Sequence, residues 1–197
     1  MSPRLRDVLH DVTGVLQARG VGFALVGGLA VSVRTEPRFT RDADLAVAVD
    51  DDEGAQTVVR ALAPRYEPVT VLEHEAIGRM AAVRLGQAGQ APTGLVVDLL
   101  FASSGVEPEI VGTAEPLEVF AGVQVPVART GALVVTKLLA RDASRPLDAA
   151  DLQALLAVAD RDDVALAERL IELVMVRGTN RGRDLREDWR DLEASQR

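Results

Sequence analysis

Two aspartates, Asp42 and Asp44, stand two residues apart at the start of the apolar run "LAVAV". Side chains alternate along a β-strand, so both carboxylates face the same side of a strand predicted at residues 44–50. Carboxylates are poor strand formers and are costly to bury unpaired, and two like charges on one face repel each other. The fold that contains this pair must therefore place a cation beside it.

A glycine pair and a third carboxylate belong with these aspartates. Gly27-Gly28 lies between a predicted strand at residues 22–27 and a predicted short helix at 29–35. Glycines allow close approach of the backbone to a ligand, and a helix N-terminus offers free N–H groups to an anion. Asp98 interrupts the apolar run "LVVDLL", where a carboxylate without a partner is expensive.

A metal site accounts for all three carboxylates. Paired carboxylates together with substrate phosphates are a usual protein environment for Mg²⁺, and a third carboxylate beside the pair loses its burial cost when it joins them. The sequence therefore predicts a triphosphate cradle facing a two-metal site that favours in-line displacement at phosphorus.

A purely structural interpretation of the same residues stays open. Asp42 would then cap the end of a strand, and Asp44 would pair with Arg38 or Arg41. Asp98 would pair with another arginine. This interpretation needs three independent pairings, whereas a single metal site would explain all three carboxylates.

Composition sets the broad class of the protein. The 197 residues are enough for one domain or for a domain with a helical appendage, and 48% are hydrophobic while only 3% are aromatic. The absence of cysteine excludes disulfides and thiolate metal sites. A charged N-terminus and the lack of a long apolar run predict a soluble, cytoplasmic protein that does not enter a membrane. The net charge of −8 argues against non-specific binding of polyanions.

The hydrophobic pattern changes period near residue 129. Strand patterns dominate before this point and helical patterns after it, which predicts an α/β (α+β) fold: a mixed sheet flanked by helices, followed by a helical C-terminal part. The predicted domains are residues 1–129 and 130–197. Predicted helices span 3–19, 51–64, 131–142, 149–160 and 163–177, and predicted strands span 66–72, 79–85, 95–102 and a pair within 117–128. Turns are predicted at 91–94 and 121–122.

The last stretch, "VRGTNRGRDLREDWRDLEASQR", is rich in arginine. It fits either a local basic surface for nucleic acid or a solvated helix in which arginines pair with acidic residues. Trp189 fits packing against the helical part better than stacking on a base.

The order of these residues resembles a known superfamily. The glycine pair, then Arg38, Thr40, Asp42 and Asp44, resembles the nucleotidyltransferase signature of a glycine turn followed by a D-x-D strand and a later strand carboxylate. Together with the downstream "TKLLARDASRPLDAADLQALL", the chain resembles the AbiEii/AbiGii-type nucleotidyltransferase toxins, a group that includes mycobacterial toxins acting on the acceptor end of tRNA. The resemblance covers residues 22–50 and 95–156. Many members carry Gly-Ser at the turn, so a hydroxyl contact to phosphate is missing here.

The resemblance implies roles for the residues of the first motif. Asp42 and Asp44 would bind the metals, and Asp98 would be the third metal-binding carboxylate, nearest the attacking hydroxyl. Gly27 and Gly28 would hold the β- and γ-phosphates.

The resemblance also implies roles in the second motif. Lys137 would contact the triphosphate, and at least one of Asp148 and Asp151 would be needed for activity. Structural alternatives remain: Lys137 and Arg141 could form a solvated helix face, and Asp148 and Asp151 could be the N-cap and N3 residues of the next helix.

The arginines between the glycine turn and the aspartate pair also have two explanations. Arg34, Arg38 and Arg41 could balance the carboxylates by ion pairing. They could instead bind phosphates, for which the planar guanidinium fork is suited. The position of Arg38 within the motif favours a role in nucleotide binding.

The expected function follows from the resemblance. The chain would be a Mg²⁺-dependent enzyme that transfers a nucleoside monophosphate from an NTP such as ATP or CTP to the 3′ end of tRNA. Pyrophosphate would be released, translation would stop, and a cognate antitoxin would be the protein partner. An antibiotic nucleotidyltransferase of the aminoglycoside or lincosamide kind is the alternative, since an acidic chain suits a cationic drug. A third possibility is an inert member of the fold that only binds a partner.

Overall fold

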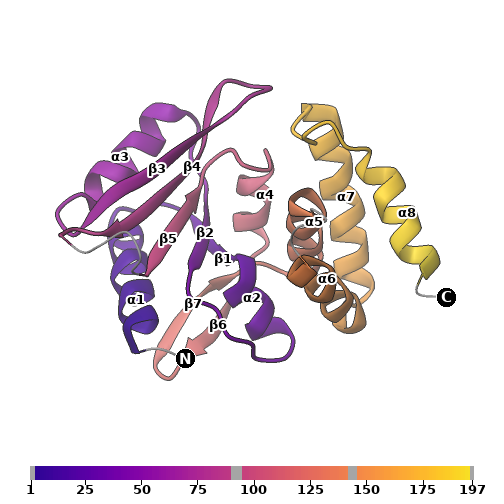
Figure 1. Cartoon of the computed structure of the whole chain (residues 1–197), viewed down its shortest axis with the longest axis horizontal. Helices are drawn as coiled ribbons and strands as arrows, with labels where there is room; N and C mark the ends of the chain where they lie inside the picture. Colours follow the sequence, from indigo (N-terminus) through magenta and orange to yellow (C-terminus); the bar gives the residue numbers. More distant parts are fainter. Residues whose placement is uncertain (1–2, 90–94, 142–145, 196–197) are drawn as a thin grey trace.

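The computed structural model describes residues 3–89, 95–141 and 146–195, and Figure 1 shows a twisted sheet with helices on both faces and a helical bundle to one side. Seven strands form one sheet in the order β3-β4-β5-β2-β1-β7-β6. The strands are β1 (Phe23–Val26), β2 (Ala43–Val47), β3 (Tyr66–His74), β4 (Arg79–Gln87), β5 (Val96–Leu100), β6 (Glu115–Phe120) and β7 (Val123–Val127).

The sheet is mixed. β2 pairs with β5 and β1 pairs with β7 in parallel, whereas β1–β2, β3–β4, β4–β5 and β6–β7 are antiparallel. The predicted fold class is therefore confirmed. All four residues of β1 and most of β2 are buried, as expected for central strands covered on both faces.

Eight helices are present in the described ranges. They are α1 (Pro3–Ala18), α2 (Gly27–Arg34), α3 (Asp52–Leu62), α4 (Glu107–Gly112), α5 (Thr130–Ala140), α6 (Pro146–Val158), α7 (Arg161–Arg177) and α8 (Leu185–Ser195). α1 and α3 contact each other and the sheet on one side. α2 and α4 pack on the central strands β1 and β2, and the bundle α5–α8 lies beyond them (Figure 1). α2 contacts both the sheet and the bundle, so it joins the two parts at the place where the candidate site lies.

Local sequence explains where several helices begin and end. The Asp51 side chain accepts a hydrogen bond from the Gly54 amide and caps α3. Asp160 and Asp163 form a reciprocal capping box at the start of α7, which ends at Gly178 in the left-handed conformation. The buried side chains, mostly Ala, Val and Leu, form one continuous core that runs from α1 to Trp189 in α8.

Most predicted elements are present within a few residues of their expected bounds. The short helix α4 was not predicted, because six residues carry little periodicity. The turn at residues 91–94 lies outside the described residues. β7 ends and α5 begins close to the predicted boundary at residue 129, and the division into two domains stays a prediction.

The arginine-rich C-terminal stretch forms helix α8 with ion pairs. Arg186 pairs with Glu172 of α7, and Arg183 pairs with Asp188. Trp189 is only 6% exposed and packs in the core, as the sequence analysis predicted. No helix in the described ranges combines the length and the apolar character needed to cross a bilayer.

Candidate active site

The glycine pair forms the first turn of α2 at the end of β1. Gly27 has φ +65°, a left-handed conformation that favours glycine, and a Cβ at this position would overlap the carboxylate of Asp44. A Cβ on Gly28 would lie 2.8 Å from an Nη atom of Arg38. Because Val26, which precedes the helix, offers no side-chain cap, the amides of the first turn remain available to an anion.

The sheet brings the three predicted carboxylates together. In the parallel pair β2–β5, Asp44 lies directly opposite Asp98, so both side chains project from the same face. Asp42 precedes β2 by one residue and faces the same side, since it is two residues from Asp44. The register thus places residues 54 positions apart in the chain on neighbouring strands.

The electrostatics of this group are unfavourable in the protein alone. Burial raises the pKa of Asp44 to about 6, and repulsion from Asp98 and Asp42 adds to the effect, while Lys137 and Arg84 act against it. Burial also raises the pKa of Asp42, with Asp98 adding to the effect and Arg84 and Arg41 opposing it. Two neighbouring carboxylates with raised pKa values are the donors that a bound cation would stabilise in the charged form.

Asp98 has a partner that the sequence did not identify. Arg84 of β4 lies opposite Asp98 in the antiparallel register, and its guanidinium donates from Nε to Oδ1 (2.8 Å) and from Nη2 to Oδ2 (2.6 Å). This bidentate bond to Asp98 raises the pKa of Arg84. The structural interpretation expected Asp98 to pair with an arginine, and this pair is present. In the sequence, the only signal for it was a basic residue inside the predicted strand 79–85.

Lys137 lies at the centre of a second charged cluster. Its side chain comes from α5, is 8% exposed at the residue level, and places Nζ 2.6 Å from Asp148 Oδ1 and 2.7 Å from Asp151 Oδ2. Arg38 donates to both oxygens of Asp151, at 2.9 and 2.7 Å. The structural alternative in which Lys137 belongs to a solvated helix face is wrong, since the side chain is buried against α6.

The capping interpretation of Asp148 and Asp151 is also wrong. α6 begins at Pro146, so Asp148 lies inside the first turn and Asp151 in the second, and both are buried. Both side chains form ion pairs with Lys137.

The three arginines after the glycine turn make different contacts. Arg38 pairs with Asp151, and neither it nor Arg41 forms an ion pair with Asp44 in the described part of the chain. Arg34 pairs with Glu115 and donates to the carbonyls of Val127 and Ala128, so it ties α2 to the sheet and to the segment before α5.

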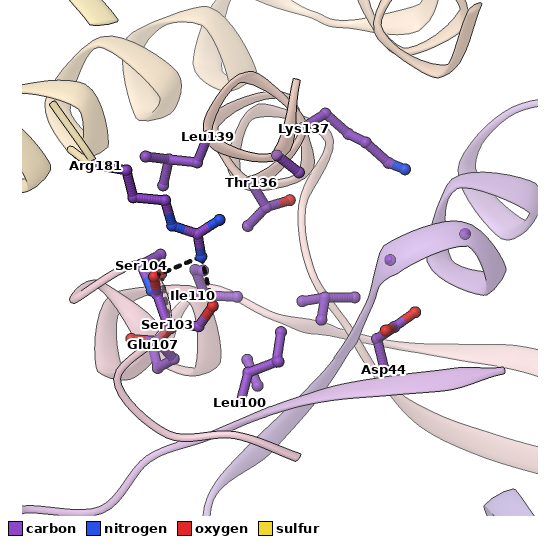
Figure 2. Close-up of a pocket in the computed structure, with 15 residues that line it drawn as sticks. Asp44, Leu100, Ser103, Ser104, Glu107, Ile110, Thr136, Lys137, Leu139 and Arg181 are labelled. Atoms are coloured by element: carbon purple, nitrogen blue, oxygen red, sulfur yellow. Dashed lines mark hydrogen bonds between the residues drawn. The ribbon is translucent and has the colours of Figure 1, made fainter. Parts of the chain in front are cut away.

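Two cavities meet at these residues. An open cleft of about 580 Å³ contains Gly28, Arg38, Asp42, Asp44, Asp98, Lys137 and Asp148 in its wall. A more enclosed cavity of about 230 Å³ adjoins it and shares Gly28, Asp44 and Lys137 with it. Figure 2 shows Asp44 and Lys137 at one end of this second cavity and Ser103, Ser104 and Arg181 at the other, with Leu100, Ile110 and Leu139 among its walls.

The three carboxylates differ in how well they suit a divalent cation. Asp42 and Asp44 suit the task, because no side chain of the described ranges hydrogen-bonds or ion-pairs with either carboxylate and both have raised pKa values. Asp98 is already bonded to Arg84, and in the described residues no three acidic or histidine side chains form a ready metal-binding group. The pair therefore fits a cation that completes its coordination with water or phosphate, and Asp98 stands beside it.

The family of the chain follows from a sequence profile. The profile of the nucleotidyl transferase AbiEii toxin family, of type IV toxin–antitoxin systems, matches residues 14–196. The chain belongs to this family. The glycine turn, the carboxylates and the Lys137 cluster all lie inside the matched range. A search of curated protein sequences finds no match.

Solved structures support the same fold for this AbiEii family member. A solution structure of the antibiotic-resistance factor ANT(2'')-Ia is 17% identical, with a TM-score of 0.53 over 100% of this chain and 98% of that one. An antigenic nucleotidyltransferase-like protein from Paracoccidioides brasiliensis is 16% identical, with a TM-score of 0.52 over 92% and 94% of the two chains. At these identities the likeness shows a nucleotidyltransferase fold.

Proposed function

We propose that this protein transfers a nucleoside monophosphate from an NTP to the 3′ end of tRNA, releases pyrophosphate, and thereby blocks translation until a cognate antitoxin counteracts it in the cytoplasm. One observation carries the proposal. Asp42 and Asp44 have raised pKa values and carboxylates without a side-chain partner in the described ranges, and they line one cleft with Gly28 of the uncapped α2 N-terminus and with Lys137.

The triphosphate would lie against the glycine turn. Gly27 and Gly28 add no side chains of their own to the first turn of α2, so its amides would be open to a phosphate, with the Asp44 carboxylate and the Arg38 guanidinium beside them. Lys137 adds a positive charge to the wall of the same cleft, and its pairs with Asp148 and Asp151 hold the ammonium in place. In this assignment Lys137 binds the nucleotide, whereas Asp148 and Asp151 are positioning residues.

Arg38 completes that wall. Its bidentate contact with Asp151 fixes the guanidinium beside Gly28, where a Cβ would meet it. The remaining donors of the fork can then reach a phosphate oxygen.

Asp42 and Asp44 would hold Mg²⁺. The bound metal would stabilise charge on the phosphates and on the leaving pyrophosphate. In the transfer, the acceptor oxygen forms a bond to the α-phosphorus, and the bond from that phosphorus to the bridging oxygen of pyrophosphate breaks. Asp98 stands on the far side of Asp44 from the glycine turn, and in this proposal it would be the carboxylate nearest the attacking hydroxyl, with its orientation held by Arg84.

The decisive experiment incubates the protein with total tRNA, Mg²⁺ and each of four α-labelled NTPs. We expect label on the 3′ end of tRNA from at least one nucleotide with the wild type, none with Asp44→Asn, and full labelling with Asp50→Asn, which changes an exposed aspartate outside the site. No tRNA labelling from any nucleotide would refute the tRNA assignment.

Transfer to an antibiotic is the second candidate. The likeness to the resistance factor ANT(2'')-Ia over the whole chain favours it, as does the acidic net charge of −8, which suits a cationic drug. Pyrophosphate release that depends on an aminoglycoside or lincosamide, with no labelling of tRNA, would establish this function in place of the first.

A further inference from the structure

The enclosed cavity beside the candidate site contains a carboxylate with an unpaired oxygen. Glu107 is the first residue of α4, lines this cavity and is only 2% exposed. Its Oε1 accepts hydrogen bonds from the backbone N–H of Ser104 (2.7 Å) and from the Ser104 hydroxyl (2.9 Å). Its Oε2 is buried and has no hydrogen-bond partner among the residues that the structure describes. Oε1 therefore holds the turn before α4, whereas Oε2 has no structural role that these contacts explain.

The neighbouring cation does not satisfy this oxygen. Arg177 of α7 lies close enough to Glu107 to act as a countercharge. Its guanidinium, however, donates to both oxygens of Glu109, at 3.0 and 2.6 Å, and to the carbonyl of Gly105 at 2.6 Å. Buried polar atoms in folded proteins almost always have a hydrogen-bond partner, so Oε2 points to a donor that enters the cavity from outside the chain.

The size and lining of the cavity fit one ring system. Its volume of about 230 Å³ is smaller than that of pockets for drug-sized ligands, roughly 300–1,000 Å³, so it suits one part of a larger ligand. Leu100, Ile110 and Leu139 are among its walls, and Figure 2 shows Glu107 at the end of the cavity opposite Asp44. Apolar walls suit the faces of a planar ring, and a polar end can bind its edge.

The position of the cavity connects it to the nucleotide site. It shares Gly28, Asp44 and Lys137 with the open cleft, and these are residues to which the proposed function assigns the phosphates and the metal. A nucleotide whose triphosphate lies at these residues can extend its base into the enclosed cavity. The open cleft is then left for the acceptor.

We propose that the enclosed cavity holds the base of the incoming NTP and that Oε2 of Glu107 accepts a hydrogen bond from the exocyclic amino group of that base. The assignment rests on the proposed function, since it takes the triphosphate to lie at the glycine turn. An ionised carboxylate only accepts hydrogen bonds, so it favours a base that carries an amino group. Adenine, cytosine and guanine carry one and uracil does not, so Glu107 selects against UTP.

The first test uses the wild-type protein and matched pairs of nucleotides. Calorimetry with Mg²⁺ and without an acceptor gives the Kd of the four NTPs and of three analogues that lack the amino group. The analogues are purine riboside triphosphate for ATP, zebularine triphosphate for CTP and inosine triphosphate for GTP. We expect UTP to bind most weakly of the four NTPs. The NTP that binds most tightly should lose roughly 10- to 150-fold in affinity with its amino group, the range for a hydrogen bond to a charged group.

The second test changes the carboxylate. Glu107→Gln keeps an oxygen for Ser104 and replaces the acceptor Oε2 by an amide N–H donor. We expect the preference for the amino group to disappear and the affinity for UTP to rise. The Kd for tripolyphosphate, which has no base, should stay at the wild-type value. Glu168→Gln, at an exposed position of α7, removes the same charge and is the matched control, and thermal unfolding checks the fold of both variants.

The outcomes separate this assignment from the proposed reaction. Equal Kd values within every nucleotide pair would overturn the assignment, since water would then satisfy Oε2, and labelling of tRNA would still establish the reaction. Selection for the amino group without any tRNA labelling would retain the base pocket and reject tRNA as the acceptor. If Glu107→Gln weakens tripolyphosphate as much as the NTP, Glu107 has a structural role only and the assignment is wrong.

Discussion

Replacing Asp44 by asparagine is expected to stabilise the metal-free fold while it abolishes transfer. The folded protein raises the pKa of Asp44 from 3.8 to about 6, so the ionised carboxylate is disfavoured in the folded state. A difference of about 2.2 pKa units corresponds to about 3 kcal/mol at neutral pH, since one unit is 1.36 kcal/mol. The residue retains some solvent exposure, so this value is an upper bound.

The sign of the pH dependence follows from the same shift. Well below pH 3.8 the side chain is protonated in both states, and the substitution removes no charge. Between pH 4 and 6 the folded state binds more protons than the unfolded state, so the wild type loses stability as the pH rises. The advantage of Asp44→Asn should therefore be small at pH 4 and approach its full value above pH 6.

The assay is urea denaturation of both proteins in EDTA at several pH values, with thermal unfolding as a second readout. For a chain of this size, each kcal/mol corresponds to about 2–4 °C in Tm. Asp50→Asn, at an exposed position, controls for the general loss of one negative charge and should change little. Adding Mg²⁺ should stabilise the wild type and leave Asp44→Asn unchanged, because only the wild type retains both carboxylates. Two results would refute the electrostatic argument: an Asp44→Asn protein that is less stable than the wild type at pH 7 in EDTA, or a stability difference between the two proteins that is the same at pH 4 and at pH 7.

Three further substitutions test other parts of the structure. Gly27→Ala should lower the stability of the fold by more than about 1 kcal/mol and abolish NTP binding measured by calorimetry, because φ is +65° and the added methyl group meets Asp44. The control Gly14→Ala has open space around it in α1 and should stabilise the fold slightly. Lys137→Met should destabilise by up to about 3 kcal/mol in urea and raise the KM for the NTP, because buried Asp148 and Asp151 lose a cation, and an unchanged KM would remove Lys137 from the nucleotide site. Trp189→Ala should cost about 3–5 kcal/mol of stability through the cavity it leaves, and a loss below 1 kcal/mol would show that α8 is not part of the core.

Much of the architecture could be predicted because its signals are local. Helical and strand periods, the glycine pair and the two-residue spacing of Asp42 and Asp44 are all visible in short windows, and the structure has these elements within a few residues of the expected bounds. α4 was missed for the complementary reason, since a helix of six residues barely completes a hydrophobic period.

The start of α6 shows a different limit. The spacing of Asp148 and Asp151 matched an N-cap and its N3 partner, but the helix already begins at Pro146. Proline is well suited to the first turn of a helix, and the earlier start puts both aspartates inside the helix, where they pair with Lys137.

The sequence by itself determined the kinds of groups in the site and the face of the strand on which Asp42 and Asp44 stand, because these follow from the alternation of side chains. Only the tertiary structure decided what each group meets. Strand register placed Asp98 beside Asp44 and Arg84 beside Asp98, and the docking of α6 brought Asp151 to Arg38 across 113 residues of chain. Such pairings depend on which elements become neighbours and in what register, and no local pattern contains that information.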